Sequence, residues 1–510
     1  MRIYTLYFLM KHTTPFLPAF GSLLFGRRPK SEQAKALEKL KSTNTLGDLK
    51  AVCTDSIPDE LLSPAAKGDL SRRRQYSLPV LFWAFLAQIL TPNTSCREIV
   101  RRVQAWRASA DSETDSSHKT DSSHKTVAYC KARAKIPEKT LAKISKHIAD
   151  RCERNTPEDA LWKGRHVKII DGTTISMPDT PLNQKDYPQP SSQKPGCGFP
   201  LMRLVGLFSL ASGALLEFAT GNNHIHETML FRRLWGFLEK KDILLADRGF
   251  CSFYALAQLK KQGIDSVIRL NQSRNSDMTK GKKLASNDRL QTWTKPVKPP
   301  TGVSEEEFAT VPETLTVRVV EIHFAAKGFR STSCLIVTTL LDTEIYTVES
   351  LGELYFQRWT VELHFRELKT FLGMEILRCR SPHMIKRELL MHTIAYNVIR
   401  HVMQSASLRN HKPLSRISFK GSLDTLRHWP PILDAARKSP RKQRRLLLDM
   451  LRLIAADTIL ERPGRSEPRA KKRRPKNYHL LTKPRKSMGH VPRRNRPGKN
   501  PRKNPKPTLS

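Results

Sequence analysis

The sequence is poor in acidic residues, has no long apolar run and carries its cysteines far apart. Only 47 of its 510 residues are Asp or Glu, against 89 Lys and Arg. A bilayer-spanning helix needs about 18 consecutive apolar residues, and no run reaches that length, so no association with a membrane is expected. The eight cysteines form no CxxC pair and no dense pattern, which argues against a zinc knuckle or a disulfide scaffold and favours reduced thiols in a cytosol.

The excess of positive charge indicates a polyanionic partner. The formal net charge is +42, and every cation that neutralises a phosphate releases a condensed counterion. A ribosomal or packaging protein needs only the charge, but such chains are usually short or low in complexity, whereas 39% of this chain is hydrophobic. Composition therefore predicts nucleic-acid binding, while it leaves catalysis open.

Residues 31–155 have helical periodicity. A Ser-x-x-Glu capping box opens one helix at Ser95. The basic side chains of Lys131, Arg133 and Lys135 on a later short helix suit a DNA-binding module. A helical cap with solvated charges explains the same pattern equally well, because helix-turn-helix patterns are weak in a single sequence.

Both ends of the chain differ from its middle. We expect a disordered leader over residues 1–30, where prolines and charges interrupt the apolar patches. Residues 401–462 are predicted to be helical. The tail at 463–510 has 17 Lys and Arg against one acid and nine prolines, which predicts a disordered basic segment that assists binding.

Residues 160–400 predict an α/β catalytic domain. Hydrophobic runs and turn signals give the order strand, strand, strand, helix, strand, helix, strand. These elements are expected at 166–170, 201–210, 214–220, 227–239, 243–246, 253–262 and 266–270. A meander that leads into α/β units is the order of a ribonuclease H-like mixed sheet. We predict an all-β insertion at about 275–345, followed by helices at 351–372 and 389–403.

Two aspartates each follow a short apolar run and have a glycine within the next two residues. Asp171 ends the run at 166–170, and Asp247 ends the run at 243–246. A carboxylate at the carboxyl end of a strand projects from the sheet edge, and neighbouring strands can place two such groups close together. Like charges at short range raise each other's pKa unless a cation neutralises them, and Mg²⁺ prefers hard oxygen ligands. The pattern predicts a divalent-cation site.

The helix at 351–372 carries a narrow polar stripe. At about 100° per residue, Tyr355, Arg358, Glu362 and Lys369 fall within about 60° of one another. A salt-bridged helix face is one explanation of such a stripe.

Apolar residues flank the stripe on both sides. Phe356 and Leu363 lie on one flank, and Val361 and Phe365 lie on the other. We expect both flanks to be buried, which makes the polar stripe costly unless it lines a functional cleft.

The spacing Tyr355-x₂-Arg358-x₃-Glu362-x₆-Lys369 resembles the YREK signature of bacterial insertion-sequence transposases with a DDE catalytic domain. Asp171 and Asp247 precede it in the order of that family, at separations of 76 and 115 residues, the second of which the β-insertion lengthens. The resemblance covers residues 160–400. It implies DNA transposition by a ribonuclease H-like domain.

The resemblance also implies roles for individual residues. Asp171, Asp247 and Glu362 resemble the catalytic carboxylates that hold two Mg²⁺ ions, for which Mn²⁺ can substitute. These ions activate water or a DNA 3′-hydroxyl for in-line displacement.

Other residues resemble the DNA contacts of the family. Tyr355, Arg358 and Lys369 resemble the residues that hold the phosphates of the transposon end. Arg248 and Arg269 lie beside the site in sequence; a contact with the DNA backbone and a structural salt bridge are equally consistent with them.

The expected partners are the inverted-repeat ends of a transposon and target DNA, bound by a homodimer in the cytoplasm of a bacterium, associated with the nucleoid. A catalytically inactive DNA-binding descendant and a ribonuclease H-like nuclease are the alternatives. The intact carboxylates argue against the first, and the polar stripe with its basic flanking domains argues against the second.

Overall fold

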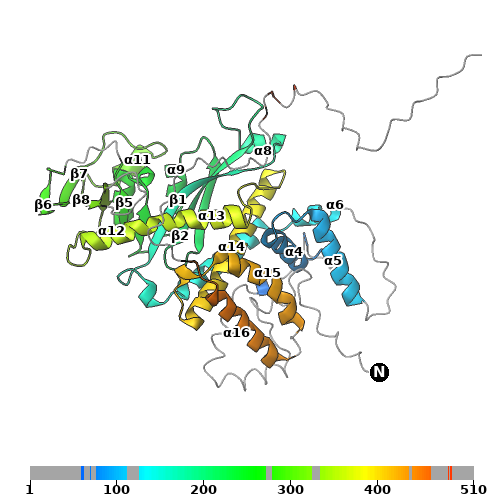
Figure 1. Cartoon of the computed structure of the whole chain (residues 1–510). Helices are drawn as coiled ribbons and strands as arrows, with labels where there is room; N and C mark the ends of the chain where they lie inside the picture. The colour runs from blue at the N-terminus through cyan, green and yellow to red at the C-terminus, as the bar shows by residue number, and fades with distance from the viewer. Residues whose placement is uncertain are drawn as a thin grey trace, which may run out of the picture.

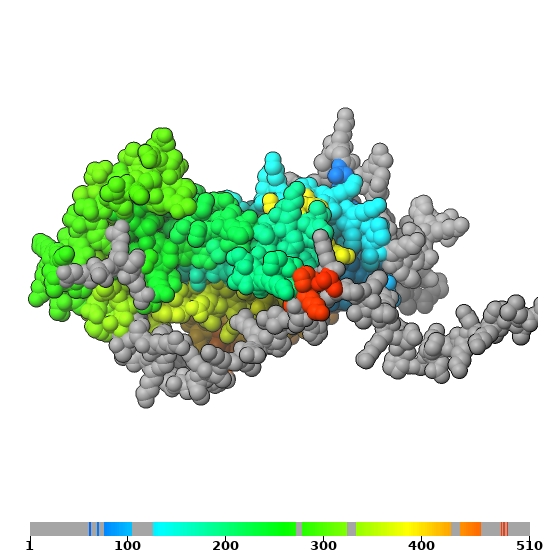
Figure 2. All heavy atoms as spheres, turned by 90° about the horizontal axis from the view of Figure 1, so that it is seen from above, coloured from blue at the N-terminus to red at the C-terminus, as the bar shows by residue number. Residues whose placement is uncertain are grey.

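The computed structural model describes residues 59–62, 69–70, 76–111, 126–271, 278–323, 333–435 and 439–460, with four single residues at 481, 483, 484 and 487. The predictions for a leader at 1–30 and for nearly all of the tail at 463–510 therefore lie outside the described residues. The described part is elongated, with the strands after residue 278 at one end and the N-terminal helices at the other (Figure 2).

One mixed sheet forms the centre of the α/β fold (Figure 1). Its nine strands in the described part of the chain are ordered β3-β2-β1-β4-β5-β9-β8-β7-β6. Strands β1, β4 and β5 are parallel, and every other neighbouring pair is antiparallel. The strands are β1 (Val167–Ser176), β2 (Leu201–Ser209), β3 (Leu215–Asn222), β4 (Ile243–Ala246), β5 (Asp265–Arg269), β6 (Lys282–Ala285), β7 (Asp288–Thr294), β8 (Thr314–His323) and β9 (Ser333–Thr338).

Helices cover both faces of the sheet. On one face, α9 (Glu227–Arg232) and α10 (Phe253–Lys261) pack on side chains such as Ile170 and Leu244. The alternate side chains, including Ile169 and Leu245, face the core formed with the long helix α14 (Pro382–Asn410). This alternation follows from the period of two in a strand, and it buries the centre of the sheet on both sides.

The prediction of an all-β insertion at about 275–345 is wrong in one respect, because the segment also contains a helix. Strands β6 to β9 are present, and β9 pairs with β5, so they continue the central sheet. A short helix, α11 (Glu305–Ala309), interrupts them. Ser304 and Glu307 form a reciprocal capping box that satisfies backbone donors at its start, which explains a helix in this otherwise β-rich segment.

Most of the remaining elements are helices in the two flanking regions where helices were predicted, and a few short ones lie within or next to the 160–400 segment. They are α4 (Leu78–Leu90), α5 (Cys96–Asp111), α6 (Val127–Arg133), α7 (Glu138–Arg154), α8 (Pro181–Asp186), α15 (Phe419–Ala435) and α16 (Pro440–Ala456), with short turns η2 (Asp59–Leu62), η3 (Glu158–Ala160), η4 (Trp235–Phe237) and η8 (Leu414–Arg416). Among the described helices, none combines the length and apolar character that a bilayer crossing requires.

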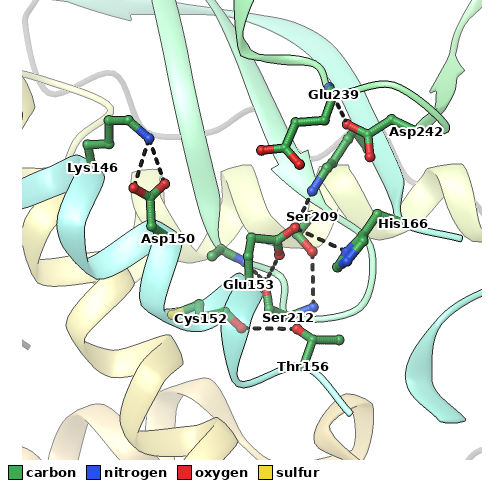
Figure 3. A network of polar contacts seen from close by, with 12 residues as sticks. Lys146, Asp150, Cys152, Glu153, Thr156, His166, Ser209, Ser212, Glu239 and Asp242 are labelled. Atoms are coloured by element: carbon green, nitrogen blue, oxygen red, sulfur yellow. Dashed lines mark hydrogen bonds and ion pairs between the residues drawn. The ribbon is translucent and has the colours of Figure 1, made fainter. Parts of the chain in front are cut away.

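A polar network fixes α7 to the sheet. Glu153, near the end of α7, points toward His166 and Ser212 (Figure 3) and also forms an ion pair with Lys168 of β1. The Ser212 hydroxyl donates to Glu153 at 3.0 Å. Although burial opposes it, the hydrogen bond with His166 and the charge and hydrogen bond of Lys168 lower the pKa of Glu153 to about 2. The carboxylate therefore stays ionised at neutral pH and ties the N-terminal helices to the start of β1.

Candidate active site

Asp171 does not end its strand, contrary to the prediction. Strand β1 continues to Ser176 because β2 pairs with it along its whole second half, with Asp171 opposite Gly206. The parallel pairing of β1 with β4 stops earlier, at Ile169. Asp171 thus lies just beyond the last residue that β4 covers, which opens one side of the strand at its carboxylate.

The Asp171 carboxylate is mostly buried and incompletely neutralised. Its Oδ1 accepts a hydrogen bond from the backbone N–H of Gly172 at 2.8 Å, and its Oδ2 lies 4.0 Å from the Arg358 guanidinium. Burial raises the pKa of Asp171 from 3.8 to about 6, and the charges of Asp247 and Glu227 contribute to the rise. Burial is thus the main reason that ionisation of Asp171 is disfavoured, and the hydrogen bond from Gly172 and the charge of Arg358 offset only part of it.

Asp247 directly follows β4 and opens the turn η5 (Arg248–Phe250). This is the strand-end position predicted from the sequence. The carboxylate acts electrostatically on Asp171, Cys334 and Tyr355, whose pKa values it raises in each case. Asp171 and Asp247 therefore share one region at the edge of β1 and β4.

The helix predicted at 351–372 is segmented. It consists of α12 (Val348–Phe356), a 3-10 turn η6 (Gln357–Trp359), α13 (Thr360–Arg366) and a π-helical turn η7 (Glu367–Phe371). These segments follow one another across the sheet (Figure 1). Because a 3-10 turn and a π turn wind differently from an α-helix, the stripe computed at a constant angle is only approximate.

Two members of the stripe are buried against the sheet. Tyr355 is 1% exposed, and burial raises the pKa of its hydroxyl. Arg358 is 6% exposed, and its guanidinium stacks 4.6 Å from the Trp359 ring centre. The Nε of Arg358 has no hydrogen-bond partner among the described residues. A buried guanidinium with an unused donor can accept an anionic ligand.

The other two members lie further out. Glu362 in α13 is exposed. Lys369 is half-buried, and its Nζ donates to the Thr173 hydroxyl at 3.2 Å and to the Thr174 carbonyl at 3.1 Å. The lysine thus holds η7 against β1 three residues after Asp171.

One of the two flanks expected to be buried is not. Phe356 and Leu363 are 46% and 45% exposed, whereas Val361 and Phe365 are 0% and 6% exposed. The burial of both flanks is therefore wrong, because the sheet covers only one side of this helix. The stripe lies at the border between the core and the surface.

The two additional arginines differ in position. Arg248 is exposed in η5. Arg269 ends β5 opposite Ile336 of β9 and is half-buried. Its charge lowers the pKa of Tyr355 and Cys334 against the larger effect of burial, so it faces the same region as Arg358.

The carboxylates provide the oxygen ligands that a divalent cation prefers, but the described acids do not form a complete metal site. Asp171 and Asp247 offer hard oxygen atoms, and a bound cation would favour the ionised form of Asp171, whose pKa is raised mainly by burial. Within the described residues, no group of three or more His, Cys, Asp or Glu is close enough to hold a metal ion. The structure brings the two aspartates together and leaves Glu362 exposed on the neighbouring helix.

Sequence reasoning missed Glu227, the first residue of α9. A Cβ added to Gly172 would lie 2.6 Å from the Glu227 carboxyl carbon, so the acid lies directly over the residue after Asp171. Arg203 is 3.9 Å from the Glu227 carboxylate. The available signal was a glycine beside a predicted catalytic aspartate, which can mark a close approach of another group.

A second missed feature is the buried cluster that fixes the helix of Glu362. Arg400 of α14 forms an ion pair with Glu367 at 2.6 Å and donates to the Tyr396 hydroxyl at 3.0 Å. Tyr396 in turn donates to the Gly213 carbonyl at 2.7 Å. These contacts join η7, α14 and the turn between β2 and β3.

Comparison with known proteins supports a transposase domain in this chain. Residues 162–398 match the family model described as "Transposase DDE domain", and the matched segment contains every site residue discussed above. The transposase InsG for insertion sequence element IS4 of Escherichia coli (strain K12) is 23% identical over 464 residues, which cover 89% of this chain and 98% of that protein.

Two further similarities are more limited. InsZ of the same strain is 28% identical over 195 residues, 38% of this chain and 60% of that protein. Among solved structures, a piggyBac transposase synaptic complex with hairpin DNA aligns with 80% of this chain and 81% of that chain, at 10% identity and a TM-score of 0.40.

Proposed function

We propose that this chain, which is a metal-dependent DNA transposase with a DDE domain, cuts and joins transposon ends at Asp171, Asp247 and Glu362. The carrying observation is the position of Asp171 on β1 and of Asp247 just after the neighbouring parallel strand β4, where burial, with a smaller contribution from the nearby acids, raises the pKa of Asp171 to about 6. A structural ion pair would be expected to lower the pKa of an aspartate. A buried acid left in this state is suited to receive a cation with its substrate.

The strand order supports a ribonuclease H-like assignment for the domain. In β3-β2-β1-β4-β5 the first three strands are antiparallel and the last three parallel. Asp171 and Asp247 lie on β1 and just after β4, the two central strands of that order.

Mg²⁺ is the proposed cofactor, as two ions, with Mn²⁺ as a substitute. When bound, it supplies an activated water or 3′-hydroxyl and neutralises the charge of the phosphate under attack. Asp171 and Asp247 would hold it from the sheet edge, and Glu362 from the helix. The protein's own contribution is to fix these oxygens and to keep the surrounding helix in place.

Tyr355, Arg358 and Lys369 are the proposed contacts to the end phosphates. The unused Nε of Arg358 supports this role, because a phosphate oxygen would satisfy it. Lys369 has protein acceptors in β1 and would reach DNA only by exchanging them. Arg248, which is exposed, and Arg269, which is half-buried, are proposed as weaker contacts to the DNA backbone.

The spacing of these residues supports assignment to the YREK group of insertion-sequence transposases. The proposed partners are the inverted-repeat ends and target DNA. We further propose that the protein acts as a homodimer that pairs two transposon ends. It would do so in the bacterial cytoplasm, in association with the nucleoid. The net charge of +42 supports extensive phosphate contact.

The direct test is cleavage of a DNA end in Mg²⁺ by Asp171→Asn, Asp247→Asn and Glu362→Gln. Each should lower the cleavage rate by at least about 10³-fold, since each removes a charge needed to hold the metal, while DNA affinity changes little. The matched control is Glu353→Gln on the exposed face of α12, which should cut normally.

Three outcomes would overturn parts of the proposal. A variant that still cuts at the normal rate removes its residue from the metal site. A wild-type protein that cuts without preference for any end sequence is a nuclease, and one that binds ends without cutting is an inactive descendant. Terminal inverted repeats around the gene would independently identify the ends.

A further inference from the structure

Acids approach the edge of β1 from both faces of the sheet, just beyond the residues that β4 covers. Alternate residues of a strand point to opposite faces. Asp171 therefore lies on the face of Ile169, which shares a core with α13. Gly172 lies on the face of Ile170, which packs with α9. Helices α9 and α13 thus lie on opposite sides of β1 (Figure 1).

Glu227 is the first residue of α9, and its carboxylate lies over Gly172. A Cβ on Gly172 would come within 2.6 Å of the carboxyl carbon and within 2.9 Å of the more distant oxygen. Gly172 is not among the glycines with positive φ, so its backbone conformation does not require glycine. The absence of a side chain at this position instead leaves room for the carboxylate, and glycine within a strand often marks such a close approach.

The helix dipole explains only part of this arrangement. An acid at the start of a helix is stabilised by the partial positive charge of the backbone N–H groups. Glu138 occupies the same position in α7, where it is exposed. Glu227 differs because it lies over the residue that follows Asp171. The place of Glu227 beside the proposed cation site is therefore the feature that the dipole leaves unexplained.

Arg203 of β2 fixes the segment before α9 and leaves the carboxylate accessible. Its Nη1 donates to the Ile225 carbonyl at 2.7 Å. Its Nε has no hydrogen-bond partner among the described residues and lies 3.9 Å from Glu227 Oε1, which is too far for a hydrogen bond. The Glu227 side chain is 43% exposed, so a hydrated cation can approach it from solvent.

We propose that Glu227 is a fourth acid of the cation site, which binds the hydrated ion from the α9 face of β1. This inference rests on the proposed metal site at Asp171 and Asp247. Because no three acids of the described segments are close enough to ligate one ion together, Glu227 acts through a water molecule of the ion. Mg²⁺ gives up its water reluctantly and usually keeps several water molecules in protein sites. A carboxylate that accepts a hydrogen bond from such a water increases the affinity for the ion.

The test measures Mn²⁺ binding to the full-length protein without DNA, from the electron paramagnetic resonance signal of the free ion. Glu227→Gln should raise the Kd for Mn²⁺ about tenfold, as expected for a residue that acts on a metal without direct ligation. Glu227→Asp keeps the charge and should restore part of the affinity. Glu138→Gln removes the acid at the start of α7 and is the matched control, which should bind Mn²⁺ as the wild type does.

Gly172→Ala tests the geometry without removing an acid. The added methyl group takes the space of the Glu227 carboxylate and should raise the Kd for Mn²⁺ about as much as Glu227→Gln does. The double variant should bind no more weakly than either single variant, because both substitutions remove the same group from the site. Additive effects would contradict the proposed action of Glu227 from its place over Gly172.

The outcomes separate this inference from the proposed function. A wild-type Kd for Glu227→Gln, together with lost Mn²⁺ binding by Asp171→Asn, overturns the role of Glu227 and leaves the metal site in place. Equal weakening by Glu138→Gln would show a general effect of protein charge and would overturn that role as well. Unchanged Mn²⁺ binding by Asp171→Asn overturns the metal site itself, and with it the role of Glu227.

Discussion

Glu367 and Asp171 each lie near an arginine, but Glu367 is in direct contact with its arginine and Asp171 is not. Glu367 in η7 is 8% exposed and touches Arg400 at 2.6 Å. Although burial opposes it, Arg400 and His364 lower the pKa of Glu367. The Asp171 side chain is 25% exposed and lies 4.0 Å from Arg358. Its pKa rises to about 6.

The difference separates a structural acid from a candidate ligand. Glu367 has its counter-ion in direct contact, so its charge is compensated inside the protein. Asp171 has two other acids acting on it and an arginine at the limit of an ion pair. The fold stabilises the first charge and tolerates the second, as expected when the second is completed by a metal ion.

The largest expected effect is on stability, from Glu367→Gln. Removing one partner of a buried ion pair leaves Arg400 uncompensated, and such changes cost about 3–5 kcal/mol. Urea unfolding monitored by circular dichroism should show that loss. Glu362→Gln, an exposed acid on the adjacent α13, is the matched control and should change the free energy of unfolding by less than about 0.5 kcal/mol. Equal effects of the two variants would remove the distinction between the two kinds of acid.

The sequence was informative where local patterns decide the structure. Alternating or fully apolar runs predicted β4 and β5, and the strand-end position of Asp247 followed from the short run at 243–246. The placement of Tyr355, Arg358, Glu362 and Lys369 in one helical stretch followed from simple periodicity, although its division into four segments and the exact angles did not.

Contacts between distant segments were not predictable in the same way. Strand β1 passes Asp171 because β2 pairs with it, and Glu227 reaches Gly172 only through the packing of α9. The π turn η7 contains Glu367, whose partner Arg400 is 33 residues away. No local pattern encodes such a contact, and π turns have no sequence signature comparable to a capping box.

A middle-sized effect is expected from Asp171→Asn in metal-free protein. Because the folded-state pKa of Asp171 is raised above its unfolded value, the carboxyl contributes stability below about pH 4 that is lost as pH rises through about 6. At pH 7 the variant should therefore be more stable than the wild type by about 1–2 kcal/mol, after allowance for partial solvent screening.

Unfolding measured over a range of pH provides the control for the stability gained by Asp171→Asn. Thermal unfolding of both proteins from pH 4 to pH 7.5 in EDTA should show the advantage of Asp171→Asn growing with pH. A constant difference between the proteins would mean that amide packing, and not the buried charge, sets the stability. A less stable variant at pH 7 would place Asp171 with Glu367 as a compensated structural acid.

The smallest expected effect is the stabilisation of the folded protein by an added metal ion. A metal that binds only the folded state stabilises it by RT ln(1 + [L]/Kd), which is about 1.4 kcal/mol at tenfold excess over Kd. Mg²⁺ added at pH 7.5 should raise the Tm of the wild type by a few degrees and that of Asp171→Asn by much less. Glu367→Gln should keep the full metal-dependent rise from its lower starting Tm, because its lost charge lies in the structural cluster. If Asp171→Asn gains as much as the wild type, the ion binds elsewhere, and the raised pKa of Asp171 reflects burial without a ligand role.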